Sequence, residues 1–341
     1  MRVAVVGATG AVGQELLAIL EERRFPITEL KLYASPRSAG KAVRFKGEGH
    51  LLRSLPEDGD LGADVIFSSA GGSLSKEHAW AWASRGGVVI DNTSAWRMDA
   101  RVPLVIPEVN PDALKNHPGL IANPNCSTII ALMALAPLHR AFGLKRATVA
   151  TYQAVSGAGA AGMGELREQS QAVLAGASGP TGEPLGAPTA PVKFQHPIAF
   201  NLFSHDSEIG EDGYNTEERK LALESRKILG APQLAISATC VRVPVFRAHS
   251  ESIHAEFERP VTESDAREVL SHAPGVRVVD DRQGNRFPMP LDASGQDYTL
   301  VGRIRADMSL PGGLALFVAG DQIRKGAALN AVQIGEALLG G

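Results

Sequence analysis

The sequence has 341 residues, of which 44% are hydrophobic and 21% are charged, and its formal net charge is −3. This length is typical of about two domains, and the ordinary apolar fraction excludes a disordered or fibrous protein. The scattered basic residues do not support nucleic-acid binding, and the apolar runs are too short for a membrane span, which needs about 18 residues.

The first third of the chain alternates short apolar runs with helical patterns. The runs predicted to be buried strands are Arg2–Val6, Glu29–Ala34, Ala63–Ser68, Gly87–Asp91 and Leu104–Ile106. Helices are predicted at Ala11–Glu22 and around Leu74–Ser84. This alternation indicates a parallel, doubly wound α/β sheet of the Rossmann type.

The rest of the chain has longer β-type runs and fewer helices. Predicted helices are Ile129–Pro137, Ala158–Leu174, Thr216–Ile228 and the terminal Ile323–Leu339. Predicted strands are Ala235–Phe246, Ser252–Glu258, Tyr298–Ala306 and Leu314–Ala319. Residues 175–192, rich in Pro, Gly and Ala, are predicted to be a surface loop. The pattern favours an α+β domain with an antiparallel or mixed sheet.

A glycine-rich turn follows the first predicted strand. Gly7, Gly10 and Gly13 have the spacing G-x-x-G-x-x-G and lead directly into the first predicted helix. A pyrophosphate needs such a turn, because the backbone must approach it closely and the helix N-terminus attracts the anion. An unliganded glycine turn is the alternative interpretation.

The end of the second predicted strand indicates which dinucleotide binds. An NAD site places Asp or Glu there for the ribose 2′-hydroxyl, whereas this sequence has Arg37, Ser38 and Lys41 and no acid. A guanidinium and a hydroxyl suit a 2′-phosphate. The pattern favours NADP over an ordinary solvated basic loop.

Two cysteines are too few for a disulfide framework or a cysteine-built metal site, so we expect no metal. Cys126, in the segment Asn-Pro-Asn-Cys-Ser-Thr, precedes a predicted helix, whose N-terminus favours the thiolate. Cys240 lies in an apolar run typical of a core residue. A nucleophile needs an acid or base, and His249, where a β-run becomes polar, is the candidate. Because the chain also begins directly in a strand pattern, without a signal-peptide pattern, we expect a cytoplasmic location.

Together these motifs resemble those of the aspartate-β-semialdehyde dehydrogenase family. The segments that carry the resemblance are GATGAVG, SPRSAGK, NTSAWRM, VPLVIPEVNP, NPNCST, YQAVSGAGAAG, EERK, CVRVPVFRAHSES and KGAALNAVQI. The resemblance implies an NADP-binding Rossmann-type domain, residues 1–127 plus 321–341, and an α+β catalytic and dimerisation domain, residues 128–320. It further implies a homodimer or homotetramer that reduces L-aspartyl-4-phosphate, with release of phosphate, to L-aspartate-4-semialdehyde. That product is a precursor of lysine (through diaminopimelate), threonine and methionine.

The same resemblance assigns roles to individual residues. Cys126 would form the acyl-thioester, His249 would be the acid/base, and Gln153 would orient the substrate. The residues implied to bind the substrate are Arg97, Glu217, Lys220 and Arg242. The residues implied to contact the cofactor are Gly7, Thr9, Gly10, Ala11, Val12, Arg37, Ser38, Ser156, Gly157 and Gln322. Glu218 is adjacent to Glu217, so the register of the ammonium contact is open by one place.

Two other functions compete with this one. N-acetyl-γ-glutamyl-phosphate reductase uses the same thioester chemistry, but its acetylated amine carries no charge that would pair with Glu217. A non-catalytic NADP-binding sensor would need the glycine turn, yet it would have no use for Cys126, His249, Arg97 and Arg242 together.

Overall fold

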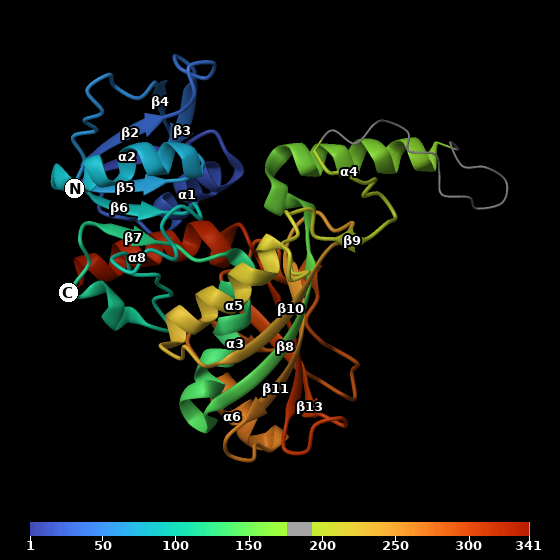
Figure 1. Ribbon diagram of the computed structural model, residues 1–341. Helices are drawn as coiled ribbons and strands as arrows, with labels where there is room; N and C mark the ends of the chain where they lie inside the picture. Colours follow the sequence, from blue (N-terminus) through green and yellow to red (C-terminus); the bar gives the residue numbers. More distant parts are fainter. Residues whose placement is uncertain (176–192, 341) are drawn as a thin grey trace. The chain divides into compact units, whose positions relative to one another are not determined.

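The computed structural model describes residues 1–175 and 193–340, and the chain packs into two compact units (Figure 1). The first unit comprises Met1–Ile129, Leu223–Pro232 and Ile323–Gly341, and the second comprises Ile130–Ala222 and Gln233–Gln322. The predicted boundaries, after residue 127 and before residue 321, each lie two residues from those of the units, and the predicted division assigns residues 223–232 to the second domain. The predicted loop 175–192 lies, from residue 176 onward, outside the described residues.

The first unit is built on a seven-stranded sheet in the order β3-β4-β2-β1-β5-β6-β7. Its strands are β1 (Arg2–Val6), β2 (Glu29–Tyr33), β3 (Ala42–Phe45), β4 (Glu48–Arg53), β5 (Val65–Ser68), β6 (Val88–Asp91) and β7 (Leu120–Ala122). β3 pairs antiparallel with β4, and the other pairings are parallel. This sheet confirms the predicted Rossmann-type fold. The chain order reverses beside β1, which is where such sheets bind nucleotides.

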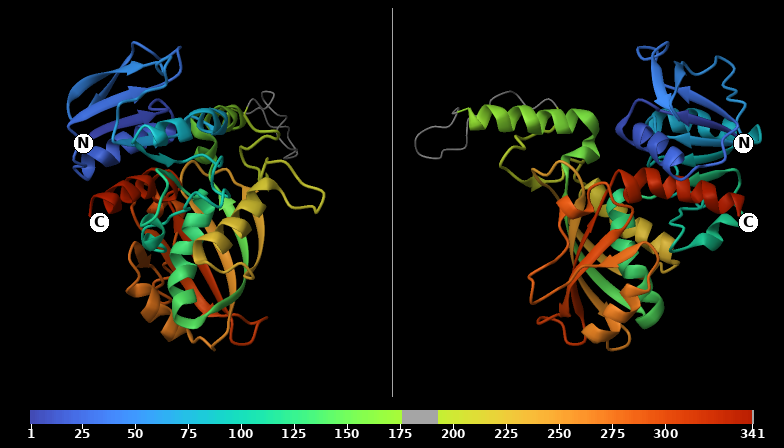
Figure 2. Two further views of the ribbon diagram at one scale, coloured as in Figure 1. Left: turned by 60° about the vertical axis from the view of Figure 1, so that its left-hand side comes forward. Right: turned by 180° about the vertical axis from the view of Figure 1, so that it is seen from behind.

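Helices cover both faces of this sheet, as the two further views in Figure 2 show. α1 (Ala11–Glu22) and α8 (Leu329–Leu339) bury their apolar sides in one core with the outward side chains of β1 and β5. α2 (Gly72–Ser84) packs against β6 and β7 from the other face. α8 follows a π-helical turn (Arg324–Ala328), so the predicted terminal helix begins irregularly. A short 3₁₀ helix (Pro111–Leu114) precedes β7.

The second unit contains a mixed seven-stranded sheet in the order β12-β13-β14-β11-β8-β10-β9. Its strands are β8 (Leu144–Gln153), β9 (Phe203–Ser204), β10 (Ala235–Arg242), β11 (His249–Phe257), β12 (Val276–Val278), β13 (Thr299–Ala306) and β14 (Leu314–Gly320). β8 pairs parallel with β10 and antiparallel with β11. The predicted strand Ala235–Phe246 ends early, at Arg242, because Pro244 has no N–H to offer a neighbouring strand.

The helices around this sheet are α3 (Cys126–Phe142), α4 (Gly159–Leu174), α5 (Thr216–Leu229), α6 (Glu263–Ser271), α7 (Pro290–Ala293) and the 3₁₀ turn Val155–Ala158. α3 begins at Cys126, three residues earlier than predicted, and continues through Pro137. Of the helices in residues 1–175 and 193–340, none is long and apolar enough to cross a membrane.

Candidate functional site

The glycine turn in the first unit has the geometry of a phosphate cradle. Gly7 has φ 90°, and a Cβ built there would lie 2.7 Å from the carbonyl oxygen of Ser69. A Cβ on Gly13 would lie 2.2 Å from the carbonyl oxygen of Gly7. Gly10 precedes α1 and offers no side-chain cap. The first N–H groups of α1 therefore face a turn that accepts only glycine at two places, an arrangement suited to an anion.

A cavity of about 570 Å³ opens beside this turn. It is lined by Val6, Gly7, Thr9, Gly10, Tyr33, Ala34, Ser35, Pro36, Ser54, Leu55, Ser69, Ala70 and Leu74. Arg37 is exposed and lies four residues after the last residue of β2. Ser38 donates its backbone N–H to the carbonyl oxygen of Ser35. Ala11 and Val12 are half-buried in the first turn of α1. The size of the cavity and the backbone donors of the turn fit a dinucleotide.

Cys126 is the first residue of α3 and is half-buried. The side-chain oxygen of Asn125 accepts the N–H groups of Ser127 (3.0 Å) and Thr128 (3.2 Å), which caps the helix. The first turn of α3 contains no acid. The helix dipole at this position favours the charged form of a thiol, so the local structure suits a nucleophile.

Arg97 lies next to this turn in the first unit and is 8% exposed. Its Nε donates to the carbonyl oxygen of Asn123 (2.9 Å) and its Nη2 to that of Asn92 (2.9 Å). Its Nη1 lies 3.2 Å from a carboxylate oxygen of Glu224 on α5. The guanidinium is thus fixed in orientation by the segment that leads into Cys126.

In the second unit, three predicted residues meet where β8, β10 and β11 end or begin. Gln153 is paired with Arg242 in the sheet register, and His249 begins β11. Arg242 is 4% exposed and donates from Nη1 to the carbonyl oxygen of Ala154 (3.0 Å). All three side chains are buried on the same side of the sheet.

The backbone decides the tautomer of His249. The N–H of Ala154 donates to its Nδ1 (3.0 Å), so in the neutral ring the proton is on Nε2. Burial lowers the pKa of His249 to about 3, with the positive charge of Arg242 as a further cause. The imidazole is therefore neutral near pH 7 and presents an N–H donor.

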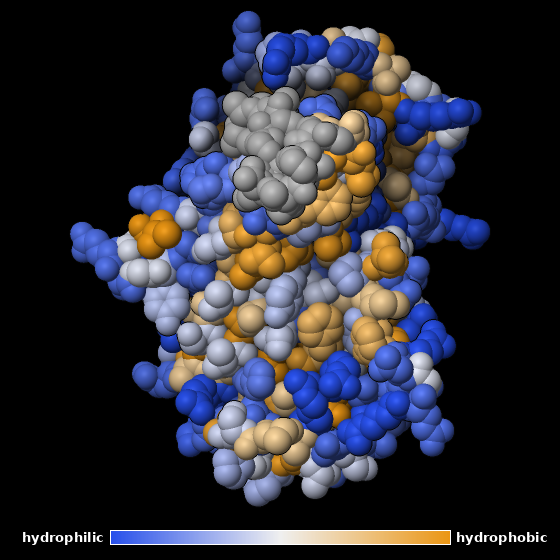
Figure 3. All heavy atoms as spheres, turned by 90° about the vertical axis from the view of Figure 1, so that its right-hand side faces the viewer, coloured by the Kyte–Doolittle hydropathy of each residue, from blue (hydrophilic) through white to orange (hydrophobic). Residues whose placement is uncertain are grey.

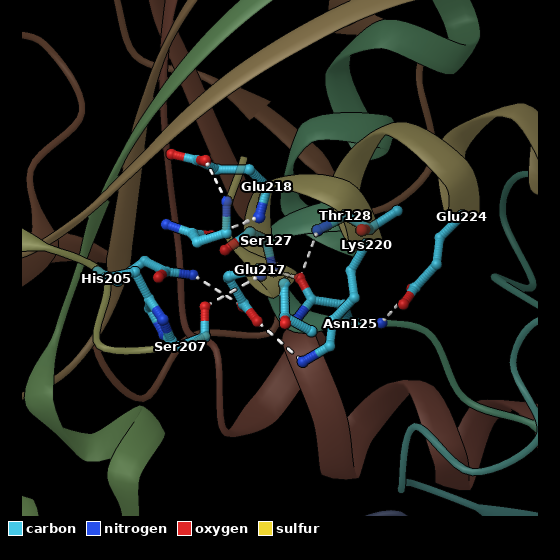
Figure 4. A network of polar contacts seen from close by, with 12 residues as sticks. Asn125, Ser127, Thr128, His205, Ser207, Glu217, Glu218, Lys220 and Glu224 are labelled. Carbon is cyan, nitrogen blue, oxygen red and sulfur yellow. Dashed lines mark hydrogen bonds and ion pairs between the residues drawn. The ribbon is translucent and has the colours of Figure 1, made fainter. Parts of the chain in front are cut away.

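Glu217 and Lys220 lie one turn apart on α5, and Figure 4 shows them with their partners. Glu217 accepts from Nε2 of Gln153 (3.1 Å) and from Nζ of Lys220 (3.1 Å). Glu218 has a different task. Its carboxylate accepts the N–H groups of Asn215 (2.9 Å) and Cys240 (3.0 Å), the first as part of the cap of α5. Of the two adjacent acids, Glu217 is the one beside Gln153.

Gly157, Ser156 and Gln322 also gather in this part of the second unit. The side chain of Gln322 donates to the hydroxyl of Ser156 and accepts the N–H of Ala248 (2.8 Å). A Cβ built on Gly157 would lie 3.3 Å from Nη1 of Arg242 and 3.5 Å from Nε2 of His249. Ala248 has φ 72°, a left-handed conformation that is unusual for a residue other than glycine.

Sequence reasoning missed three polar groups in the second unit: the half-buried His205 and Asp206 and the buried Glu251. Nη2 of Arg242 contacts Nε2 of His205 (2.8 Å) and a carboxylate oxygen of Asp206 (3.3 Å). Burial, as the largest cause, lowers the pKa of His205. Glu251, two residues along β11 from His249, is fully buried, and neither of its carboxylate oxygens has a hydrogen-bond partner among residues 1–175 and 193–340. Burial raises its pKa well above the usual value. The alternation of His249, Glu251 and Ile253 along β11 is a signal that would have indicated a buried Glu251, whereas no motif in the sequence pointed to His205.

The other cysteine differs from Cys126 in its burial and in its place in the fold. Cys240 is fully buried in β10, and burial strongly raises the pKa of its thiol. This placement is that of a small core residue, as the apolar run predicted. In the described part of the chain, no group of three or more His, Cys, Asp or Glu side chains is arranged to hold a metal ion.

The sequence matches two protein-family models. Residues 2–117 match "Semialdehyde dehydrogenase, NAD binding domain", and residues 135–325 match "Semialdehyde dehydrogenase, dimerisation domain". Among curated proteins, the aspartate-semialdehyde dehydrogenase of Synechocystis is 52% identical over 99% of this chain and 97% of that protein.

Solved structures are similar over the whole length. Aspartate semialdehyde dehydrogenase II from Vibrio cholerae, complexed with ASA, has a TM-score of 0.91 and 42% identity, and the alignment covers 99% of this chain and 97% of that one. The aspartate semialdehyde dehydrogenase from Candida albicans, solved with NADP, has a TM-score of 0.73 and 26% identity, covering 98% and 97%.

Proposed function

Because the chain belongs to the aspartate-semialdehyde dehydrogenase family, we propose that it converts L-aspartyl-4-phosphate to L-aspartate-4-semialdehyde with NADPH and with release of phosphate. The product then serves the synthesis of lysine, through diaminopimelate, and of threonine and methionine. The observation that carries the proposal is the cluster of Glu217, Arg242 and His249, which are buried in the second unit, with the half-buried Lys220 paired to Glu217. One carboxylate and two cations match a substrate with an ammonium, a carboxylate and a phosphate.

Each charged group of the substrate has a proposed partner. Arg242 binds the α-carboxylate, because its guanidinium is buried and fixed. Glu217 binds the α-ammonium, and Lys220 together with Arg97 binds the phosphate. The position of the Glu217 carboxylate between Gln153 and Lys220 supports an amine-bearing substrate. An acetylated amine, as in N-acetyl-γ-glutamyl phosphate, would leave this buried carboxylate without a cation from the substrate.

The chemistry proceeds through a covalent intermediate on Cys126. Its thiolate forms a bond to the acyl carbon, the bond from that carbon to the phosphate oxygen breaks, and inorganic phosphate leaves. Gln153 orients the resulting thioester. After reduction of the thioester carbon, the carbon–sulfur bond of the thiohemiacetal breaks, which releases the aldehyde and regenerates Cys126.

His249 acts through Nε2. Because Nδ1 accepts the N–H of Ala154, the neutral ring donates a hydrogen bond from Nε2–H to the oxygen that becomes negative at the acyl carbon. The low pKa of His249 favours this donor role over storage of a full positive charge.

The proposed cofactor is NADP. NADPH, when bound, supplies the hydride that reduces the thioester. The backbone from Gly7 to Val12 holds the pyrophosphate, and Arg37 and Ser38 hold the 2′-phosphate, a preference that the lack of an acid after β2 supports. On the second unit, Ser156 and Gly157 contact the cofactor, and Gln322 contacts its nicotinamide.

We further propose a homodimer or homotetramer that functions in the cytoplasm. The side of the second sheet opposite the cluster carries Tyr152, which is 38% exposed and packs against Phe317. Figure 3 shows apolar and weakly polar residues gathered on this side of the molecule. Such a surface is typical of a contact between copies. A single monomeric species in sedimentation velocity would contradict the oligomer, and secretion of the native protein would contradict the location.

One variant tests the covalent mechanism. Purified protein is assayed in reverse, with aspartate semialdehyde, phosphate and NADP⁺, and NADPH absorbance is followed. Cys126→Ala should lower turnover by about 10⁴-fold or more, because no other nucleophile replaces the thiol. Cys240→Ala is the matched control, and it should retain turnover within about threefold. Phosphate-dependent turnover by Cys126→Ala would contradict the mechanism.

A further inference from the structure

Glu224 is a buried carboxylate that has no role in the function proposed above. It lies on α5 and is 1% exposed. One carboxylate oxygen accepts the backbone N–H of Asn125 at 2.6 Å, and the other lies 3.2 Å from Nη1 of Arg97 (Figure 4 shows the first contact). A buried carboxylate is costly unless it is paired and hydrogen-bonded, and here both requirements are met.

Asn125 and Arg97, which are partners of Glu224, both contact or belong to the turn that leads into Cys126. Asn125 caps α3 and directly precedes Cys126. Arg97 also donates to the carbonyl oxygen of Asn123 at 2.9 Å. One ion pair therefore holds the chain at residues 123 and 125, on both sides of Pro124. The turn before Cys126 is closed by side chains from two distant parts of the sequence.

The same helix holds the segment that carries Arg97. Lys227, one turn after Glu224, donates its Nζ to the carbonyl oxygens of Arg97 (2.7 Å), Asp99 (2.8 Å) and Val102 (2.8 Å). Both the backbone and the guanidinium of Arg97 are thus fixed by α5. Of the two residues of α5 that hold Arg97, Glu224 is the one that also contacts the turn before Cys126.

We propose that Glu224 is a positioning residue, which sets the orientation of the Arg97 guanidinium and the place of the Cys126 turn for the reaction. The proposal rests on the function proposed above, in which Arg97 binds phosphate and Cys126 is the nucleophile. The contacts of Glu224 with Arg97 and with Asn125 are separable. The contact with Arg97 needs a negative charge, whereas the contact with the Asn125 N–H needs only an acceptor oxygen.

This difference gives two variants with different expected results. Glu224→Gln keeps an oxygen for the Asn125 N–H but turns an amide NH₂ group toward Arg97, where two donors oppose each other. We expect the KM for phosphate to rise about ten- to a hundredfold, while the KM for aspartate semialdehyde and the rate of Cys126 alkylation by iodoacetamide change less than about twofold. Glu224→Ala removes both contacts. It should also slow alkylation at pH 7 by about three- to tenfold, because a loosened cap weakens the helix field at the thiol.

Glu218→Gln is the matched control. Glu218 lies on the same helix, is also buried, and accepts two backbone N–H groups, but neither belongs to the cysteine turn. This variant should lower the thermal midpoint and leave the KM for phosphate unchanged. If Glu224→Gln behaves in the same way, Glu224 is only structural and the proposal is wrong. Glu224→Asp, which restores the charge, should recover part of the phosphate affinity, and no recovery would also overturn the proposal.

The alkylation rate separates this proposal from the proposed function. If wild-type protein shows no phosphate-dependent reduction of NADP⁺, the proposed function fails. Slower alkylation of Glu224→Ala than of Glu218→Gln would still support control of the Cys126 turn by Glu224. Equal alkylation rates in these two variants would overturn that part of the proposal, whatever the activity.

Discussion

Replacement of Gly157 by alanine tests where the substrate sits in the second unit. The new Cβ would lie 3.3 Å from Nη1 of Arg242, 3.4 Å from Cε1 of His249 and 3.5 Å from its Nε2. These contacts are close but need only small shifts, so we expect a loss of about 1 kcal/mol in the free energy of unfolding. The methyl group would, however, lie against the N–H groups of Arg242 and His249, which are proposed to face the substrate carboxylate and the reacting oxygen. A displacement of about 1 Å at reacting groups costs about a hundredfold, so kcat/KM should fall by about that factor.

The assay is the reverse reaction with aspartate semialdehyde, phosphate and NADP⁺, together with a thermal melt. Gly164→Ala is the matched control, because it lies in α4 and its Cβ would meet no atom of the described residues within 4 Å. This control should gain about 0.5–1 kcal/mol of stability from helix propensity and keep its activity. If Gly157→Ala retains kcat/KM within twofold of wild type, the reacting atoms do not lie over His249 and Arg242.

Two further predictions concern the buried acid and the nucleotide turn. Burial raises the pKa of Glu251 above its usual value of 4.5, so the folded protein keeps a proton on this carboxyl group at pH values where the unfolded chain has lost it. The stability that this proton contributes is fully present below pH 4.5. It is lost as pH rises toward the folded-state pKa, by up to about 1.4 kcal/mol per pH unit. Urea unfolding should therefore show Glu251→Gln gaining stability over wild type between pH 5 and pH 8, and an equal difference at both pH values would refute this. Gly13→Ala places a Cβ 2.2 Å from the Gly7 carbonyl oxygen, so it should lower stability by about 3 kcal/mol and weaken NADPH binding in a fluorescence titration. Gly49→Ala, whose nearest neighbour would be 3.9 Å away, should do neither, and a normal titration for Gly13→Ala would contradict the cradle.

The sequence predicted the first unit well where the strands are buried on both faces. β1 and α1 have the predicted bounds, Arg2–Val6 and Ala11–Glu22, because continuous apolar runs and helical spacing both reflect burial. The β3–β4 hairpin was missed. Its turn has Lys46 and Gly47 at φ 49° and 81°, and this Lys-Gly pair lacks the Asn or Asp that usually indicates such a turn.

In the second unit, β8 was missed because its residue types do not follow its pattern of burial. Buried and more exposed positions alternate from Ala147 to Gln153, but the buried ones include Thr151 and Gln153, and one of the exposed ones is Tyr152. The contacts of the site are a different matter. Glu224 reaches Asn125 across 99 positions, and Arg242 reaches Asp206 across 36. Such contacts depend on the pairing of distant elements, which local periodicity does not encode.

The backbone at Ala248 has a consequence for the histidine that follows it. A left-handed alanine carries strain of about 1 kcal/mol relative to glycine, yet its Cβ restricts the unfolded and partly opened chain more than glycine would. The hydrogen bond from its N–H to Gln322 holds that conformation. His249 therefore follows a residue whose backbone has little freedom to rotate. The backbone conformation of Ala248 thus sets the direction in which the imidazole points. A glycine at position 248 would relieve the backbone strain, but the added backbone freedom would let the imidazole of His249 change its orientation.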